Sequence, residues 1–219
     1  MSLSEKEVLH YLGYRGKTAD ERTAHIISQM ISEFKERITP RSTYGMWDCR
    51  VDASSVTLNG ITLHSVSLAK HLKDCRYAAF MAATLGVEAD TLIRRYSVRD
   101  MEKAVIAQAV CTAMIEEYCD LIESEISMNT DDGTLYASGR FSPGYGDFDI
   151  AHQKDILRLL NAKNRIGLTL TAGYMLAPAK SVTAVTGLSK EKSIARHCSL
   201  TIPKRNCENC NFKNCNFRK

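Results

Sequence analysis

Residues 140–147 (RFSPGYGD) constrain the fold more than any other stretch, because a proline is followed directly by a glycine. Pro143 fixes its own φ near the value that a tight turn needs, and Gly144 can adopt the positive φ that a type II turn requires next. We therefore expect this segment to be neither helix nor strand. Arg140 and Tyr145 would project from either side of the turn.

Such a turn has two interpretations. A guanidinium, an aromatic ring and a glycine that permits close backbone approach together suit a small anionic or zwitterionic ligand. The alternative is an ordinary surface turn with incidental neighbours, since Pro-Gly pairs mark turns in many proteins. The blocks that follow the turn favour the first interpretation.

These blocks are residues 153–160 (QKDILRLL), 166–171 (IGLTLT) and 174–187 (YMLAPAKSVTAVTG). Their order resembles the reactivation domain, which binds S-adenosylmethionine, of cobalamin-dependent methionine synthase. In that family an Arg-x-x-Pro-Gly-Tyr turn is followed by a helix and a Leu-Thr-x-x-x-Met-x-x-Pro-x-x-Ser-Val strand pair. The strong match covers residues 140–187, and a weaker likeness extends to residues 7–14 (EVLHYLGY).

The resemblance implies a stand-alone reactivation module that binds S-adenosylmethionine and presents its methyl group to a cobalamin held by a partner. Cobalamin in the inactive Co(II) state would be reduced and remethylated there, and methylation would trap the reduced state as it forms. The partner would be methionine synthase or a related corrinoid methyltransferase, and a flavodoxin or ferredoxin would supply the electron. The sulfonium already makes the methyl electrophilic, so we assign no catalytic acid or base.

The family pattern also implies roles for individual residues. Arg140 would pair with the ligand carboxylate, Ser142 and Gly144 would offer backbone contacts, and Tyr145 would pack beside the sulfonium. Two features depart from the long family members: no tyrosine follows Tyr174, and Ala172 stands where a Glu commonly follows Leu-Thr.

Several motifs of other proteins are absent from the sequence. The sequence contains no Gly-x-Gly-x-x-Gly fingerprint, which disfavours a doubly wound methyltransferase. The Asp-x-His-x-x-Gly signature of a cobalamin-binding domain is also missing, so the corrinoid would be carried elsewhere. No run of eighteen apolar residues and no apolar N-terminal stretch occurs, which predicts a cytoplasmic protein.

Periodicity predicts an α+β domain with a mainly antiparallel twisted sheet flanked by helices, over residues 1–187. A basic, Cys-rich tail would follow over 188–219. Expected helices lie at residues 4–12, 18–37, 67–73, 88–96, 101–126 and 154–160. Expected strands lie at 50–58, 61–63, 77–85, 167–171 and 181–186, although the periodicity of residues 77–85 also fits a core helix. In the longest helix we expect Val110, Met114, Tyr118 and Ile122 to face the core, with Glu116, Glu117, Glu123 and Glu125 outward.

Four cysteines are expected to be ordinary core or half-buried thiols: Cys49, Cys75, Cys111 and Cys119.

The tail contains a second group of chemically active residues, Cys198, Cys207, Cys210 and Cys215. Closely spaced cysteines in a segment too polar to form a core indicate a metal clip, that is, a site where their thiolates together bind zinc or an iron–sulfur cluster. His197 is an alternative ligand to Cys198, and reduced thiols without metal are the other interpretation.

Two other functions remain open at this level. The protein could be a metal-dependent adaptor that acts through its tail. It could also bind nucleic acid, because residues 190–219 carry a net charge of +6 whereas the remaining chain carries −2 of the overall +4. Neither alternative explains the ordered blocks between residues 140 and 187.

Overall fold

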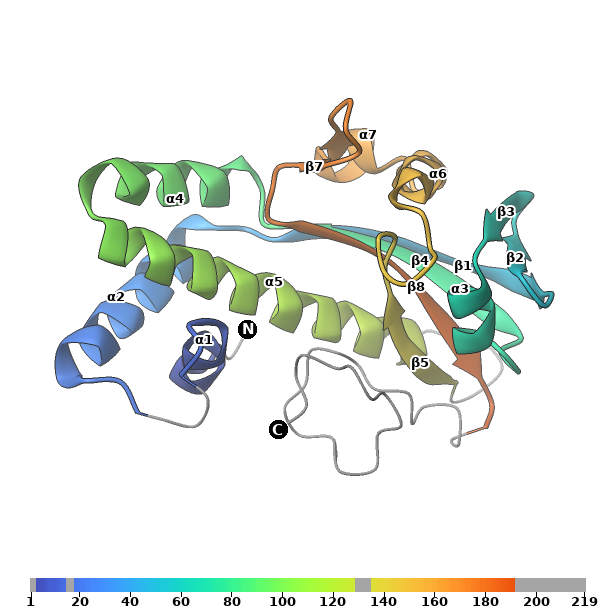
Figure 1. Ribbon diagram of the computed structural model, residues 1–219, viewed down its shortest axis with the longest axis horizontal. Helices are drawn as coiled ribbons and strands as arrows, with labels where there is room; N and C mark the ends of the chain where they lie inside the picture. Colours follow the sequence, from blue (N-terminus) through green and yellow to red (C-terminus); the bar gives the residue numbers. More distant parts are fainter. Residues whose placement is uncertain (1–2, 15–17, 129–134, 192–219) are drawn as a thin grey trace.

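The computed structural model describes residues 3–14, 18–128 and 135–191, and these form an α+β fold (Figure 1). The helices are α1 (Glu5–Tyr11), α2 (Glu21–Arg37), α3 (Val66–His71), α4 (Val87–Arg99), α5 (Met101–Met128), α6 (Gln153–Leu159) and α7 (Ala162–Ile166), with a 3-10 turn at Ile150–His152. The strands are β1 (Arg41–Val51), β2 (Ser55–Leu58), β3 (Ile61–His64), β4 (Tyr77–Thr84), β5 (Tyr136–Phe141), β6 (Thr169–Leu170), β7 (Leu176–Ala177) and β8 (Ser181–Ser189).

Six strands form the main sheet in the order β3-β2-β1-β4-β8-β5, and every neighbouring pair is antiparallel. The strands β6 and β7 form a separate hairpin. This arrangement confirms the predicted α+β class with an antiparallel sheet. It also places β5, which carries the first part of the predicted ligand segment, at an edge of the sheet.

The sheet separates two apolar cores. Helix α5 crosses one face, with α1, α2 and α4 packed against it, whereas α3, α6 and α7 cover the other (Figure 1). Strand β4 contributes to both: Met81 belongs to the α5 side and Phe80 to the opposite side, and both are fully buried. A strand buried on both faces has a continuous apolar sequence, which explains the run at residues 77–85.

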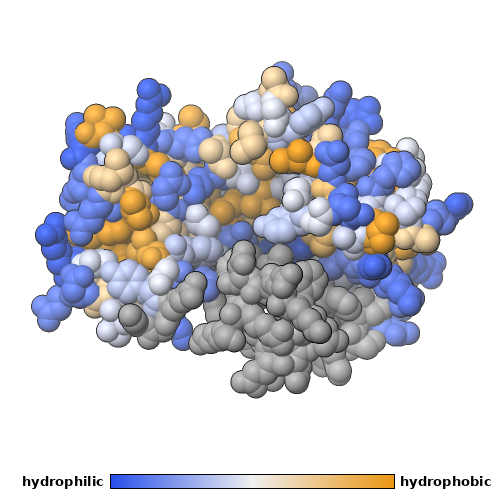
Figure 2. Space-filling view, in the orientation of Figure 1, coloured by the Kyte–Doolittle hydropathy of each residue, from blue (hydrophilic) through white to orange (hydrophobic). Residues whose placement is uncertain are grey.

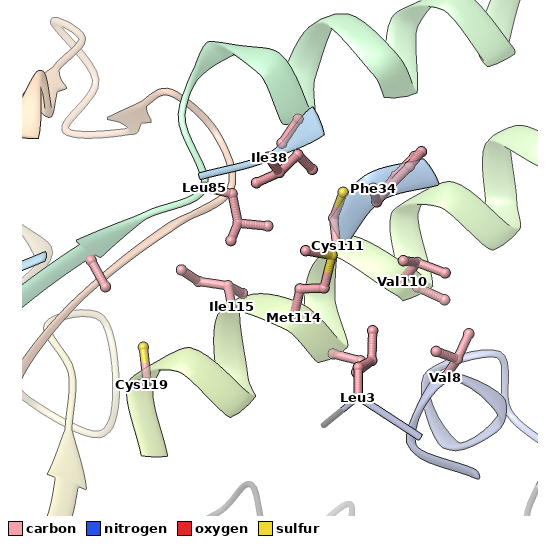
Figure 3. Packing of buried hydrophobic residues seen from close by; sticks show 14 of the residues in the cluster. Leu3, Val8, Phe34, Ile38, Leu85, Val110, Cys111, Met114, Ile115 and Cys119 are labelled. Carbon is pink, nitrogen blue, oxygen red and sulfur yellow. The ribbon is translucent and has the colours of Figure 1, made fainter. Parts of the chain in front are cut away.

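The core on the α5 side also includes the N-terminal segment. Figure 3 shows Leu3 and Val8 close to Val110 and Met114 of α5, with Phe34 from α2 nearby. Each such side chain contributes roughly 2 kcal/mol when fully buried. The weak family likeness at residues 7–14 thus falls on a helix that packs directly on α5.

Local sequence signals determine several element ends. Ser4 and Glu7 form a capping box at the start of α1, the arrangement that a serine followed three residues later by a glutamate predicts. Asp20 caps α2 by accepting a hydrogen bond from the Thr23 amide at 3.0 Å. Asn59 and Gly60 both have positive φ in the tight hairpin between β2 and β3, as an Asn-Gly pair between two strands predicts.

Other expectations are wrong. The single strand expected at residues 50–58 is the end of β1 and the whole of β2, which are separated by residues 52–54, and most of β1 is not predicted. The sequence patterns also do not predict β5, β7 or α7. Arg140 and Phe141 end a strand, although the turn signals predict none within residues 140–147. Glu116 and Glu123 do not point outward, because their side chains are only 25% and 14% exposed.

The described cysteines behave as predicted. Cys49, Cys75, Cys111 and Cys119 are free thiols that are buried or half-buried. Burial raises the pKa of Cys49 to about 11 and that of each of the other three to about 12. They are therefore neutral at physiological pH and act as small packing groups.

Within the described residues, no helix combines the length and apolar content needed to cross a bilayer. Exposed apolar residues gather over α4 and the start of α5 (Figure 2), where Val87, Val98, Met101 and Val105 lie.

The domain boundary at residue 188 stays a prediction, since residues 192–219 lie outside the described part of the chain.

Candidate functional site

Arg140 lies near the end of the edge strand β5, and a bulge directs its side chain. The pairing of β5 with β8 shifts register between Ala137 and Arg140, where Gly139 adopts φ +88°. After the shift Arg140 lies opposite Thr186 and its side chain extends towards α5. Phe141 packs instead with the core on the other face, as the alternation of a strand requires.

The guanidinium of Arg140 contacts three carboxylates of α5. Its nitrogens lie 2.6 Å from Asp120, 3.1 Å from Glu116 and 3.3 Å from Glu123. The acidic residues are four and three positions apart, so they share one face of the helix. The Arg140 side chain is only 7% exposed. We call these four residues the Arg140 cluster.

The Arg140 cluster has more negative than positive charge, and a hollow lies beside it. Glu7, His10 and Tyr11 of α1 line the hollow together with Glu116, Glu117 and Asp120 of α5. Burial raises the pKa of Glu116, and Arg140 partly offsets this effect. Burial and the same acidic neighbours raise the pKa of Tyr11 above its ordinary value, so this phenol remains protonated.

The predicted turn follows immediately after β5. The Ser142 carbonyl accepts a hydrogen bond from the Tyr145 amide at 3.2 Å, and Gly144 has φ +96°. These values confirm the type II turn that Pro143 and Gly144 predict. The Gly144 amide donates to the Phe148 carbonyl at 2.7 Å, and the Tyr145 side chain is 55% exposed. The turn therefore presents an aromatic ring and an open glycine to solvent.

The structure thus brings the predicted residues Arg140, Ser142, Gly144 and Tyr145 to one end of the edge strand. It also adds residues that the sequence patterns do not assign to the site: Glu116, Asp120 and Glu123, with Tyr11 nearby. The regular spacing of these acids on α5 is a visible signal. Its meaning depends on which helix face meets β5, and periodicity alone does not reveal that.

The predicted metal ligands Cys198, Cys207, Cys210 and Cys215 lie outside the described residues. Among residues 3–14, 18–128 and 135–191, no three His, Cys, Asp or Glu side chains are placed to hold a metal ion. The predicted metal site therefore stays untested.

Comparisons with known proteins identify the family and the fold of this chain. A family model described as "Vitamin B12 dependent methionine synthase, activation domain" matches residues 63–197, from the end of β3 to beyond β8. A solved structure, "Crystal Structure of the MetH Reactivation Domain bound to AdoHcy", is similar with a TM-score of 0.60 and 14% sequence identity. The similarity covers 82% of this chain and 71% of that one, which supports a common fold. No curated protein matches the sequence.

Proposed function

Because this chain belongs to the family of activation domains of vitamin B12-dependent methionine synthase, we propose that it binds S-adenosylmethionine and supports reductive remethylation of a cob(II)alamin. The cobalamin would be carried by a separate domain or protein, since the sequence lacks the motif that would hold it. The observation that carries this proposal is the family match, whose range includes β5, the turn and the following helix. The similar structure supports it, because that protein is described as bound to AdoHcy.

The charges of the site suit the amino-acid end of such a ligand. Arg140 would bind the carboxylate, and the acids of the Arg140 cluster would attract the ammonium group. In the structure the guanidinium is bound by Asp120, Glu116 and Glu123. A ligand carboxylate would have to replace at least one of these contacts, so only the difference between the two interactions contributes to affinity.

The turn would hold the reactive end of the ligand. Ser142 and Gly144 would provide backbone contacts, and the exposed ring of Tyr145 would lie against the cationic sulfonium. In the transfer the methyl carbon leaves sulfur, whose bond electrons remain on the neutral thioether, and Co(I) supplies the electron pair of the new cobalt–carbon bond. The chain itself has to align the methyl group and exclude water, which requires no acid or base.

A remethylation assay tests this proposal. The protein would be mixed with the cobalamin-binding module of a methionine synthase in the cob(II)alamin state, a low-potential reductant and S-adenosylmethionine labelled in its methyl group. We expect the label to appear on cobalamin, with the absorbance of methylcobalamin, only when the protein is present. If the corrinoid becomes reduced but the label stays on the donor, the proposed function is wrong.

The tail cysteines and the electron donor are the remaining parts of the proposal. A flavodoxin or ferredoxin would deliver the electron, and Cys198, Cys207, Cys210 and Cys215 would bind zinc or an iron–sulfur cluster. Metal analysis of the purified protein distinguishes these cases, because an iron–sulfur protein is brown whereas a zinc protein is colourless. A chain free of metal would contradict the predicted clip.

A further inference from the structure

The exposed tip of the turn, Gly144–Gly146, lies between two buried anchors. Pro143 precedes it and Phe148, which is 1% exposed, follows it. Apolar burial therefore holds both ends of the turn, but the tip itself faces solvent. A tip that is to align a methyl group needs a further restraint on its orientation, because a displacement of 1 Å costs roughly 100-fold in rate.

That restraint comes from α3. The carboxylate of Asp147 accepts three hydrogen bonds at the start of this helix: from Ser65 Oγ at 2.7 Å, from the Val66 amide at 2.7 Å and from the Ser67 amide at 2.9 Å. One side chain thus binds two main-chain donors that a helix N-terminus would otherwise leave without partners. The contact joins segments that are 80 to 82 residues apart in the sequence.

The fit between the turn and α3 is close at the neighbouring residue as well. A Cβ atom on Gly146 would lie 2.8 Å from Ser67 Oγ, and Gly146 has φ +57°. Only glycine avoids both the clash and the backbone strain at this position. The turn and the first residues of α3 are therefore in direct contact.

The other end of α3 holds the strand that leads into the turn. The ring of His71 lies 5.2 Å from that of Phe141, and His71 Nε2 donates to the Gly139 carbonyl at 3.0 Å. Helix α3 therefore contacts the chain before the turn through its C-terminal residue and after the turn through Asp147.

We propose that α3 fixes the orientation of the ligand-binding turn and that Asp147 is a positioning residue. Asp147 would orient Gly144 and Tyr145 without touching the ligand. This inference rests on the proposed function, since it names a part of the same site. It assigns a role to a residue immediately beyond the Arg-x-x-Pro-Gly-Tyr motif.

The test compares Asp147→Asn with Asp20→Asn in the full chain. Both residues are exposed aspartates that cap a helix, and Asp20 caps α2 through Thr23 at the opposite end of the protein. Two quantities are measured for each: hydrogen exchange of the Gly144 and Tyr145 amides, and the Kd for S-adenosylhomocysteine by calorimetry. Both amides are hydrogen-bonded within the turn, so their exchange reports its order.

We expect Asp147→Asn to accelerate exchange at these two amides and to raise the Kd roughly 10-fold. In Asp20→Asn both quantities should stay within about 2-fold of the wild type, although the variant loses a helix cap. Unchanged exchange in Asp147→Asn would overturn the proposal, and so would faster exchange with an unchanged Kd. If the wild type binds no S-adenosylhomocysteine, the proposed function fails, while the exchange data still decide whether Asp147 orders the turn.

Discussion

Arg140 connects the edge strand β5 to the long helix α5 through ion pairs, and these ion pairs contribute to the free energy of unfolding. Three carboxylates, which are between 14% and 31% exposed, surround one guanidinium. Without the guanidinium these acids would repel one another in a partly desolvated position. The contact therefore contributes to stability whether or not a ligand is present.

We expect Arg140→Met to lower the free energy of unfolding by about 3 kcal/mol, because it leaves the acids of the Arg140 cluster without their cation. Urea denaturation of the ligand-free protein measures this difference. A loss below about 1 kcal/mol would mean that water, not Arg140, satisfies the carboxylates. Arg140→Lys should lie between the two, since a lysine lacks the planar fork that reaches several acids at once.

Tyr145 offers the converse case, because its side chain is 55% exposed and contributes little to the core. Tyr145→Ala should change the free energy of unfolding by less than about 0.5 kcal/mol. It should weaken S-adenosylmethionine binding by about 1–2 kcal/mol, if the ring lies against the sulfonium. Tyr145→Phe, which keeps the ring, is the matched control, and equal affinities for the alanine and phenylalanine variants would contradict this role.

The capping of α3 by Asp147 predicts a dependence of stability on acid. Hydrogen bonds from Ser65 Oγ and the Ser67 amide lower the pKa of Asp147 below its ordinary value. The folded state therefore favours the ionised form, and this stabilisation is complete above the unfolded pKa of about 4. It is lost as the pH falls through the lower, folded pKa.

Thermal unfolding of the wild type and Asp147→Asn between about pH 2 and pH 6 measures this effect. The wild type should be more stable by a constant amount near pH 6, and the difference should shrink below about pH 4. A difference that is the same over the whole range would show that the charge of Asp147 does not matter. Asp20, whose pKa is also lowered, titrates in both proteins and cancels in the comparison.

At the level of the elements, β8 packs closely against the segment that follows α3, and this packing can be tested. A Cβ atom on Gly187 would lie 2.5 Å from Cys75 Sγ and 2.6 Å from Leu72 Cδ2. Gly187→Ala should therefore destabilise the protein by about 1–3 kcal/mol, as overpacked cores do. Gly173→Ala is the control, since a Cβ atom there would have no neighbour within 4 Å and the change should stay within about 0.5 kcal/mol. Equal melting temperatures for the two variants would contradict the packing described for β8.

How far the elements can be predicted depends on how local their causes are. Regular apolar spacing and the Asn59-Gly60 pair correctly predict most helices and one hairpin, because caps and turn residues act within a few positions. Strand β1 is predicted only in part, because its residues are mostly half-buried on both faces and show no clear alternation. Strand β5 escapes prediction because it is short and contains Gly139 at a bulge, and its pairing partner β8 lies far along the chain.

The same distinction applies to the candidate site. The turn at Pro143 and Gly144 is correctly predicted, because its cause lies in adjacent residues. Glu116 and Glu123, two of the acids that bind Arg140, are expected to face outward, since charged residues on a helix usually do. Only the packing of α5 across the sheet turns Glu116 and Glu123 towards Arg140.

At the scale of the whole molecule, the site lies where two layers meet. The edge strand β5 has α5 on one side and α3 on the other, and the turn leaves its end (Figure 1). A ligand at this place would contact charges held by one layer and a turn held by the other. Under the proposed function, this arrangement would let the chain align a methyl donor without an acid–base catalyst.

The most direct test of this account is a calorimetric titration of the full chain with S-adenosylmethionine, combined with NMR assignment of the residues whose signals shift. We predict saturable binding to one site, with shifts centred on Arg140, Gly144 and Tyr145 and on the neighbouring acids of α5. Absence of binding, or shifts that map away from β5 and its turn, would contradict the account.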